Sequence, residues 1–248
     1  MLQKSNKISS LLEVLDTISP FSLQESWDNS GLILGGKYRE FSEIYLSLEV
    51  DQNILKEVKE GSVIISHHPL IFSPFKRFVD EIYPTNLLNL AIAKKISLIA
   101  MHTNFDKTHF GSFVARKIFG EKAEIFQEDF IVYVDFNGEF DKLCELIKKR
   151  LDVKTLKTTK THSKIKKVAL VTGSGASLMR SLTEDVDCFI SGDFKYHEAM
   201  EALSYGMNLI DVGHFELERY FGEILKPILT NYGYKAIILD SQNPFNFV

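Results

Sequence analysis

The sequence predicts an α/β protein, and two patterns in it support this fold class. Short apolar runs alternate with amphipathic helical segments along most of the chain, as they do in sheets covered by helices. The order of strands and helices after residue 168 also resembles the order before residue 120, which favours two α/β lobes with a boundary near residue 125. With 248 residues, the chain can form one large core or two modest ones.

The first half is expected to begin with a helix and to continue as alternating strands and helices. Ser10 and Glu13 have the spacing of a capping box, and Pro20 follows the last turn, so a helix is predicted from Ser10 to about Ser19. The strands expected next are 44–50, 62–66 and 96–101. The helices expected between and after them are one capped by Asp51 and ending at Gly61, one over 86–95 capped by Thr85, and one ending by Gly120.

The second half shows the same alternation. Residues 130–136 alternate like a half-exposed strand, and Asp141 is expected to cap the helix that follows. Residues 152–167 are polar and basic without a period, which favours a solvated loop or an exposed edge hairpin over a basic patch that attracts phosphate. Further strands are expected at 168–173, 187–192, 208–213 and 236–240.

Composition excludes several classes of protein. With 29 basic and 33 acidic residues, the formal charge of −4 provides no general attraction to nucleic acid or to an anionic membrane. No apolar stretch approaches the roughly 20 residues of a membrane span, and the first residues lack the pattern of a signal peptide. Cys144 and Cys188 lack metal-ligand spacing and are interpreted as reduced thiols. We therefore expect a cytoplasmic protein.

Five of the seven histidines lie just after a predicted strand. In open α/β sheets, ligands bind at the carboxyl ends of the strands, so these positions are the candidates for a functional site. Neighbouring residues on a strand point to opposite faces, and the adjacent pair can therefore converge only beyond the strand end, which Pro69 provides. The candidates are His67 and His68, then His102 with Asp106, then His197, and finally His214 with Glu218.

Each of these motifs also has an ordinary interpretation. The His67–His68 pair can be a surface accident, and Asp106 can simply cap the next helix. His214 and Glu218 are four residues apart and share one helix face, as many solvated pairs do. Together, however, they form a set of imidazoles and carboxylates without a thiolate, which suits Zn, Mn, Fe, Co or Ni. Five donors exceed the needs of one tetrahedral ion, so the set predicts a two-metal site.

Two further motifs remain open between a functional and a structural role. Gly173, Ser174 and Gly175 follow a strand and open a helical pattern, where backbone N–H groups can receive a phosphate or form a tight turn. His197 is either a proton carrier or a buried, hydrogen-bonded histidine. Cys188 lies inside an apolar strand and is expected in the core.

Five segments, in order and spanning nearly the whole chain, resemble motifs of the Nif-three-like proteins, also labelled GTP cyclohydrolase type 2 homologues. They are SWDNSGLILG (26–35), SHHPLIF (66–72), HTNFD (102–106), GDFKYHEA (192–199) and DVGHFELERY (211–220). The resemblance implies two interlinked α/β lobes with mixed sheets and covering helices, and a dinuclear metal site in the cleft between them. Residues 1–125 with 193–248 would form the metal-binding lobe, and 126–192 a smaller second lobe.

The resemblance also implies particular residues and partners. The family's metal ligands correspond to His67, His68, Asp106, His214 and Glu218, which would hold two divalent transition-metal ions. The family more often has a glutamate where Asp193 stands. A hexameric ring and a nucleotide as the small-molecule substrate are implied as well.

The implied activity is metal-dependent hydrolysis of GTP, which opens the guanine ring and yields formate and dihydroneopterin triphosphate. His102 or His197 would move protons, and the turn of Gly173, Ser174 and Gly175, or Lys195, would hold phosphate. Trp27, Asp28 and Asn29 would line the substrate entrance or form a buried structural corner. Two alternatives stay open, namely a two-metal phosphoester or nucleotide hydrolase and a non-catalytic ring that binds metal or a partner.

Overall fold

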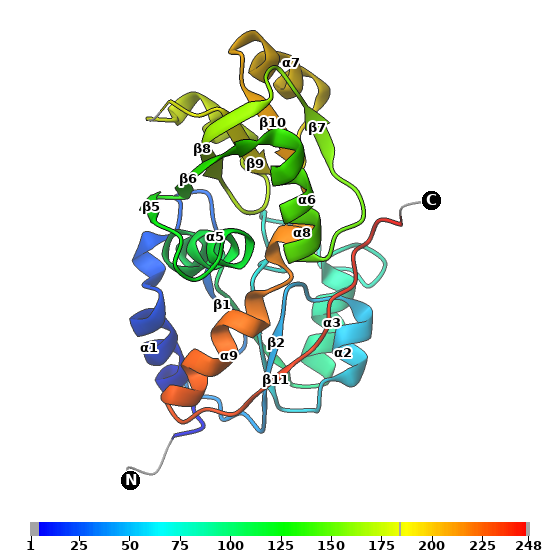
Figure 1. Cartoon of the computed structure of the whole chain (residues 1–248). Coiled ribbons are helices and arrows are strands. Elements are labelled where there is room, and N and C mark those ends of the chain that lie inside the picture. The colour runs from blue at the N-terminus through cyan, green and yellow to red at the C-terminus, as the bar shows by residue number, and fades with distance from the viewer. Residues whose placement is uncertain (1–4, 184, 247–248) are drawn as a thin grey trace. The chain divides into compact units, whose positions relative to one another are not determined.

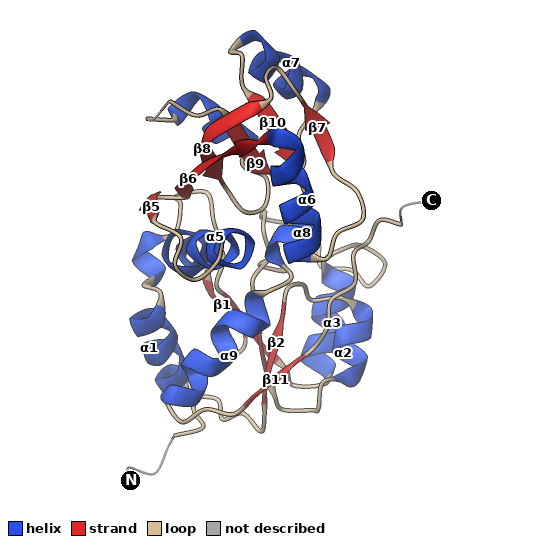
Figure 2. Cartoon of the chain, in the orientation of Figure 1, coloured by secondary structure: helices blue, strands red, loops and turns tan. Residues whose placement is uncertain are grey.

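The computed structural model describes residues 5–183 and 185–246. The chain separates into two compact units, of which unit 1 comprises Met1–Phe105 and Tyr220–Val248 and unit 2 comprises Asp106–Arg219. Each unit has one mixed sheet with helices (Figure 1 and Figure 2). The predicted α/β fold class is therefore confirmed. In the described ranges, no helix has the length and apolar character that crossing a membrane requires.

The sheet of unit 1 has five strands in the order β1-β4-β3-β2-β11. Strands β4, β3, β2 and β11 run parallel to one another, and β1 runs antiparallel to β4. The strands are β1 (Gly31–Leu34), β2 (Ile44–Ser47), β3 (Val63–Ser66), β4 (Ser97–Ala100) and β11 (Ala236–Ile238).

Helices surround this sheet. They are α1 (Ile8–Ile18), the 3₁₀ turn η1 (Phe21–Leu23), α2 (Gln52–Glu57), α3 (Thr85–Ala93), the short α4 (Thr103–Phe105) and α9 (Phe221–Asn231). Tyr45, Ile64 and Leu98 form one row across three strands and pack in a core cluster with Ile54 of α2 and Leu88 of α3. Helix α9 lies beside β2 and β11 (Figure 1). The buried face of each strand is therefore set by the two-residue alternation of its side chains.

The sheet of unit 2 has six strands in the order β5-β6-β8-β9-β10-β7. Strands β8, β9 and β10 are parallel, whereas β5, β6 and the edge strand β7 pair antiparallel. The strands are β5 (Ile125–Glu128), β6 (Ile131–Glu139), β7 (Lys157–Thr159), β8 (Lys164–Leu170), β9 (Cys188–Ser191) and β10 (Asn208–Asp211). The helices are the π-helical turn η2 (Asp106–Phe110), α5 (Gly111–Phe119), α6 (Phe140–Leu151), the 3₁₀ turn η3 (Ala176–Ser181), α7 (Tyr196–Ser204) and α8 (His214–Glu218).

The two units differ in extent from the expected lobes. The prediction placed 106–125 and 193–219 with the first lobe, whereas both segments belong to unit 2. The physical reason is that α5 packs on β5, β6 and α6, and that β10 is hydrogen-bonded between β9 and β7. The C-terminal segment does return to unit 1, as expected, because β11 pairs with β2.

Some local expectations also need correction. Helix α1 begins at Ile8 with Lys7 at its N-cap, so Ser10 lies inside it. Thr85 lies within α3, and Asp141 lies in the first turn of α6, whose N-cap is Glu139. An acidic side chain in a first turn still favours the helix through the macrodipole. Part of 152–167 forms the exposed edge strand β7, but β7 pairs with β10 and does not form a hairpin with β8.

Candidate metal centre

Three parallel strands bring histidines to one edge of the unit 1 sheet. Strands β2, β3 and β4 end in register, so the residues that follow them share this edge. His67 and His68 come directly after β3, and His102 comes two residues after β4. Strand β1 is antiparallel and starts opposite Ala100 at the end of β4, so the segment before Gly31 lies at the same edge.

His67 is fully buried and is held through one ring nitrogen. Its Nδ1 lies 2.8 Å from the carbonyl oxygen of Met101. A carbonyl oxygen can only accept, so Nδ1 carries the proton and the lone pair of the neutral ring is on Nε2. The ring also packs on Phe221 of α9, with 5.6 Å between the ring centroids.

His68 is held in the same way by a carboxylate. Its Nδ1 lies 2.5 Å from Oε1 of Glu49, which follows the neighbouring strand β2. Glu49 was not among the predicted site residues, because a strand over 44–50 would have enclosed it. Strand β2 ends at Ser47, so Glu49 lies beyond the strand end, and β2 pairs with the strand that precedes the two histidines.

His102 is oriented by Asp28, the side chain of which is fully buried. The Asp28 carboxylate accepts hydrogen bonds from His102 Nδ1 at 2.8 Å and from the backbone N–H of Thr103 at 3.0 Å. It also accepts from Thr103 Oγ1, from Ser30 Oγ and from the N–H of Asn29. Burial alone would raise the pKa of Asp28, but the hydrogen bonds from His102 and Thr103 outweigh it and hold the pKa well below its usual value.

The three imidazoles form a cluster that could hold a metal ion. His67, His68 and His102 each offer a ligand atom, and these atoms all lie within 4.8 Å of one another. Each ring has an acceptor at Nδ1, as metal-ligating histidines usually do. The structure thus groups His102 with the two predicted ligands.

Unit 2 brings together the other three predicted ligands. His214 Nε2 lies 2.9 Å from Oε2 of Glu218, one turn later on α8. The other ring nitrogen, Nδ1, lies 2.7 Å from Oδ2 of Asp193. The side chain of Asp193 is shorter than the glutamate more common in the family, but it still reaches and orients His214. The segment GDFKYHEA therefore contributes a group that positions one of the predicted ligands.

Asp106 lies beside Glu218 within unit 2. Carboxylate oxygens of the two residues are within 4.8 Å of each other. Thr172, which follows β8, donates a hydrogen bond from Oγ1 to Oδ1 of Asp106 at 3.4 Å. The next residue, Gly173, has φ +64°, and a Cβ built on it would lie 2.2 Å from Glu218 Oε1. Only glycine allows the turn to pass so close to this carboxylate.

The backbone groups of the turn of Gly173, Ser174 and Gly175 take part mainly in hydrogen bonds to nearby segments of unit 2. The N–H of Gly175 donates to Ser191 Oγ at 2.8 Å, and the carbonyl of Gly173 accepts from the N–H of Gly192 at 2.8 Å. Ser174 is exposed, and the segment after the turn is the 3₁₀ turn η3. These contacts favour the tight-turn interpretation over a phosphate cradle.

The remaining predicted residues lie at two places. Trp27 is exposed, with its ring 6.3 Å from that of His102, and Asn29 donates from Nδ2 to the carbonyl of Ile71 at 2.6 Å. Lys195 and His197 are exposed at the start of α7 in unit 2, so the interpretation of His197 as a buried histidine is wrong.

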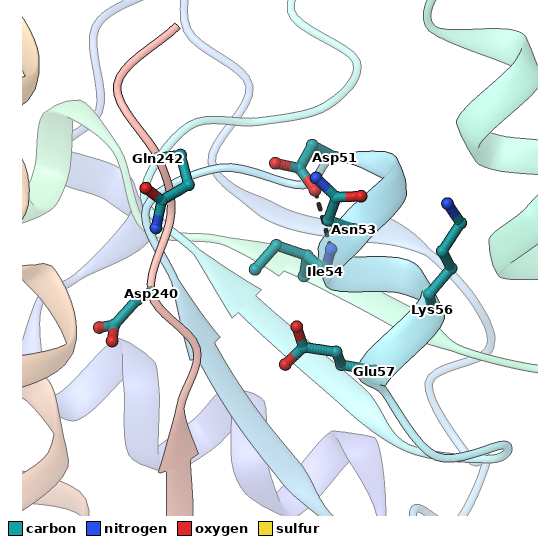
Figure 3. A pocket seen from close by; sticks show the side chains of 7 residues that line it. All are labelled: Asp51, Asn53, Ile54, Lys56, Glu57, Asp240 and Gln242. Carbon is teal, nitrogen blue, oxygen red and sulfur yellow. Dashed lines mark hydrogen bonds between the residues drawn. The ribbon is translucent and has the colours of Figure 1, made fainter.

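A pocket elsewhere in unit 1 has different chemistry. It has a volume of about 320 Å³ and lies between α2 and the segment after β11 (Figure 3). Its lining residues are Asp51, Asn53, Ile54, Lys56, Glu57, Asp240 and Gln242. Asp51 already serves as the N-cap of α2, accepting from the N–H of Ile54 at 2.8 Å. The lining lacks imidazoles, so it does not match the donor sets described above.

The donor chemistry fits divalent transition metals. Unit 1 offers imidazole nitrogens held in one tautomer, and unit 2 offers one imidazole with two carboxylates. Zn, Mn, Fe, Co and Ni accept ligands of both kinds. The histidine rings donate hydrogen bonds from Nδ1 to the carboxylates of Glu49, Asp28 and Asp193, and such hydrogen bonds orient metal ligands and raise their basicity.

Comparisons with known proteins agree over nearly the whole chain. The model of the Duf34/NIF3 (NGG1p interacting factor 3) family matches residues 6–244. A protein of Campylobacter jejuni named GTP cyclohydrolase 1 type 2 homolog is 47% identical over 242 residues, covering 97% of this chain and 99% of the relative. The GTP cyclohydrolase 1 type 2 of Helicobacter pylori J99 is 45% identical, with 97% and 99% covered. The crystal structure of a hypothetical protein from Staphylococcus aureus superposes with a TM-score of 0.87 at 26% identity, covering 99% of this chain and 100% of that chain.

Proposed function

Because the chain belongs to the Duf34/NIF3 family, we propose that it is a hydrolase that depends on two divalent transition-metal ions. The proposed ligands are His67, His68, Asp106, His214 and Glu218. The observation that supports this best is the fixed orientation of His67 and His68, whose Nδ1 atoms face the Met101 carbonyl and the Glu49 carboxylate. Such ions supply Lewis acidity and lower the pKa of water toward about 7.

The proposed substrate is GTP. Relatives that are 44% to 47% identical carry the name GTP cyclohydrolase 1 type 2 or its homolog. In this reaction one water is consumed, the imidazole ring of guanine opens at C8, and formate and dihydroneopterin triphosphate are formed. A homohexameric ring is proposed with it, from the family resemblance, and a cytoplasmic location, from the composition of the sequence.

The chain's own residues have separate roles in this proposal. Asp28 fixes Nδ1 of His102, so Nε2 is the nitrogen with which His102 takes up or releases a proton. His197, exposed at the start of α7, is the second candidate for proton transfer. Lys195, which is exposed, is the proposed contact for the phosphates.

The test measures metal content and formate release on the same purified protein. We expect about two metal equivalents and metal-dependent formate release from GTP in the wild type. His68→Ala and Glu218→Ala should lose metal and activity, whereas His162→Ala, which removes a histidine outside both donor sets, should keep them.

Each result bears on a different part of the proposal. Unchanged metal content in both ligand variants would reject the ligand assignment. Bound metal without formate would reject GTP ring opening, and phosphate release from GTP or a phosphoester would then identify the two-metal phosphoesterase alternative. Bound metal with neither product would favour a binding role.

A further inference from the structure

Two large aromatic side chains are exposed beside the histidine cluster of unit 1. Trp27 is 57% exposed and Phe72 is 51% exposed. Their ring centroids are 5.9 Å apart with the ring planes tilted by 57°. Both rings lie edge-on to His102, at 6.3 Å for Trp27 and 6.0 Å for Phe72. The pair therefore adjoins a residue of the proposed reaction centre.

These two rings are held in place by the backbone beneath them. Trp27 precedes Asp28, which is anchored by its hydrogen bonds to His102 and Thr103. Phe72 follows Ile71, the carbonyl of which accepts from Asn29 Nδ2 at 2.6 Å. The two loops are thus joined to each other and to the strand ends. Exposed apolar rings that lie together often mark a binding surface. Because the backbone beneath these rings is anchored, binding of a ligand to them costs little conformational entropy in ordering the two loops.

We propose that Trp27 and Phe72 form a stacking site for the planar base of a nucleotide, an inference that rests on the proposed function. Aromatic side chains bind bases by stacking, which tolerates different bases because every base has a π-face. The edge-on contacts with His102 place a stacked base next to the imidazole that is proposed to move protons. The base of the substrate, and not its phosphates, is therefore recognised here.

The chain offers a direct probe for this site, because Trp27 is its only tryptophan. Fluorescence of the metal-loaded protein is titrated with GTP, with guanosine and with inorganic tripolyphosphate. GTP and guanosine should quench the fluorescence, whereas tripolyphosphate, which has no base, should leave it unchanged. Phe72→Ala should weaken the binding of GTP and guanosine by about 10-fold or more, and Phe72→Tyr should retain it.

A matched control is Phe126→Ala, which removes a phenylalanine that is similarly exposed, at 57% against 51% for Phe72, but lies on β5 of unit 2. Its affinity for GTP should equal that of the wild type. Unchanged GTP and guanosine affinity in Phe72→Ala, or equal quenching by tripolyphosphate, would overturn the stacking site. So would a Phe72→Ala protein that changes its oligomeric mass while keeping its affinity, because the rings would then contact a second copy.

Formate release separates this inference from the proposed function. Base-dependent quenching that Phe72→Ala weakens, without any formate, would support the stacking site and reject the ring-opening reaction. Formate release with the same KM for GTP in Phe72→Ala and in the wild type would support the reaction and reject the stacking site.

Discussion

The carboxylate of Asp28 shows how one residue organises the histidine edge of unit 1. It accepts hydrogen bonds from both sides, from Asn29 and Ser30 of its own loop and from His102 and Thr103 after β4. Because the carboxylate is saturated and fully buried, it positions other groups and does not reach a substrate. The expectation that Asp28 lines a substrate entrance therefore changes to a positioning role.

We expect Asp28→Asn to lower the free energy of unfolding at pH 7 by about 2–4 kcal/mol, because an amide NH₂ cannot accept and leaves buried donors unpaired. The pKa of Asp28 is lowered in the folded state from its ordinary value of 3.8. Its stabilising contribution is therefore present above about pH 4 and is lost as the pH falls further toward the folded-state pKa. Urea unfolding at pH 7 and below pH 4 measures both effects.

The control for this substitution is Asp141→Asn, at a side chain that is 75% exposed. It should change the free energy of unfolding by less than about 0.5 kcal/mol. A difference between wild type and Asp28→Asn that stays constant below pH 4 would contradict the linkage to this carboxyl group.

At the residue scale, the sequence predicted the histidines better than the groups that hold them. His67 and His68 could be placed at a strand end because an apolar run and Pro69 mark that end. Glu49 could not be assigned to His68, because their contact depends on where β2 stops and on which strand lies beside β3. Pairings between separate segments have no local signal in a single sequence.

At the element scale, the turn after β8 and helix α8 fit together through one glycine. Gly173 faces Glu218, and the helix spacing brings His214 and Glu218 to one side of α8. The i, i+4 spacing was visible in the sequence, as was the helix that it requires. The close approach of Gly173 was not, because it depends on the positions of two strands and a helix.

Gly173→Ala is expected to displace Glu218 and reduce the bound metal. The left-handed φ of +64° adds a cost of about 1–2 kcal/mol for any residue with a Cβ. Gly206→Ala is the matched control, because Gly206 has φ +69° with nothing within 4 Å of an added Cβ. Both variants should lose similar stability in thermal unfolding, and only Gly173→Ala should lose metal in elemental analysis. Equal metal content in the two variants would show that Glu218 is not a ligand.

At the scale of the whole molecule, unit 2 is an insertion in the chain of unit 1. The two segments of unit 1 meet where β11 pairs with β2 and where α9 packs beside them. The sequence correctly indicated two α/β lobes and the return of the C-terminus, but not the boundaries. Periodicity predicts that α5 is a helix, whereas the sheet on which it packs is decided by tertiary contacts.

We expect a fragment of residues 106–219 to fold alone, because this continuous segment contains all six strands of its sheet. Burial raises the pKa of the Cys188 thiol on β9 well above its usual value, so the thiol should resist alkylation in the folded fragment. In a chain cut after residue 219, unit 1 should not fold, because the chain lacks Phe221, Leu225 and Leu229, which are fully buried.

Alkylation of Cys188 and fluorescence of Trp27 report on the two units separately, since the tryptophan lies in unit 1 and the thiol in unit 2. Rapid alkylation of Cys188 in the 106–219 fragment would show that unit 2 needs the rest of the chain. Native-like Trp27 fluorescence in the chain cut after residue 219 would contradict the role of α9.

The contact between His67 and Phe221 has a consequence for the order of events during synthesis. A ribosome completes unit 2 before it adds the segment that contains α9 and β11, and domains generally fold as they emerge. His67 reaches its final packing only when Phe221 has been added, which happens after the whole of unit 2. The nascent chain therefore carries His67 long before α9 can pack against it, and we expect metal to bind at the proposed site only after α9 is in place.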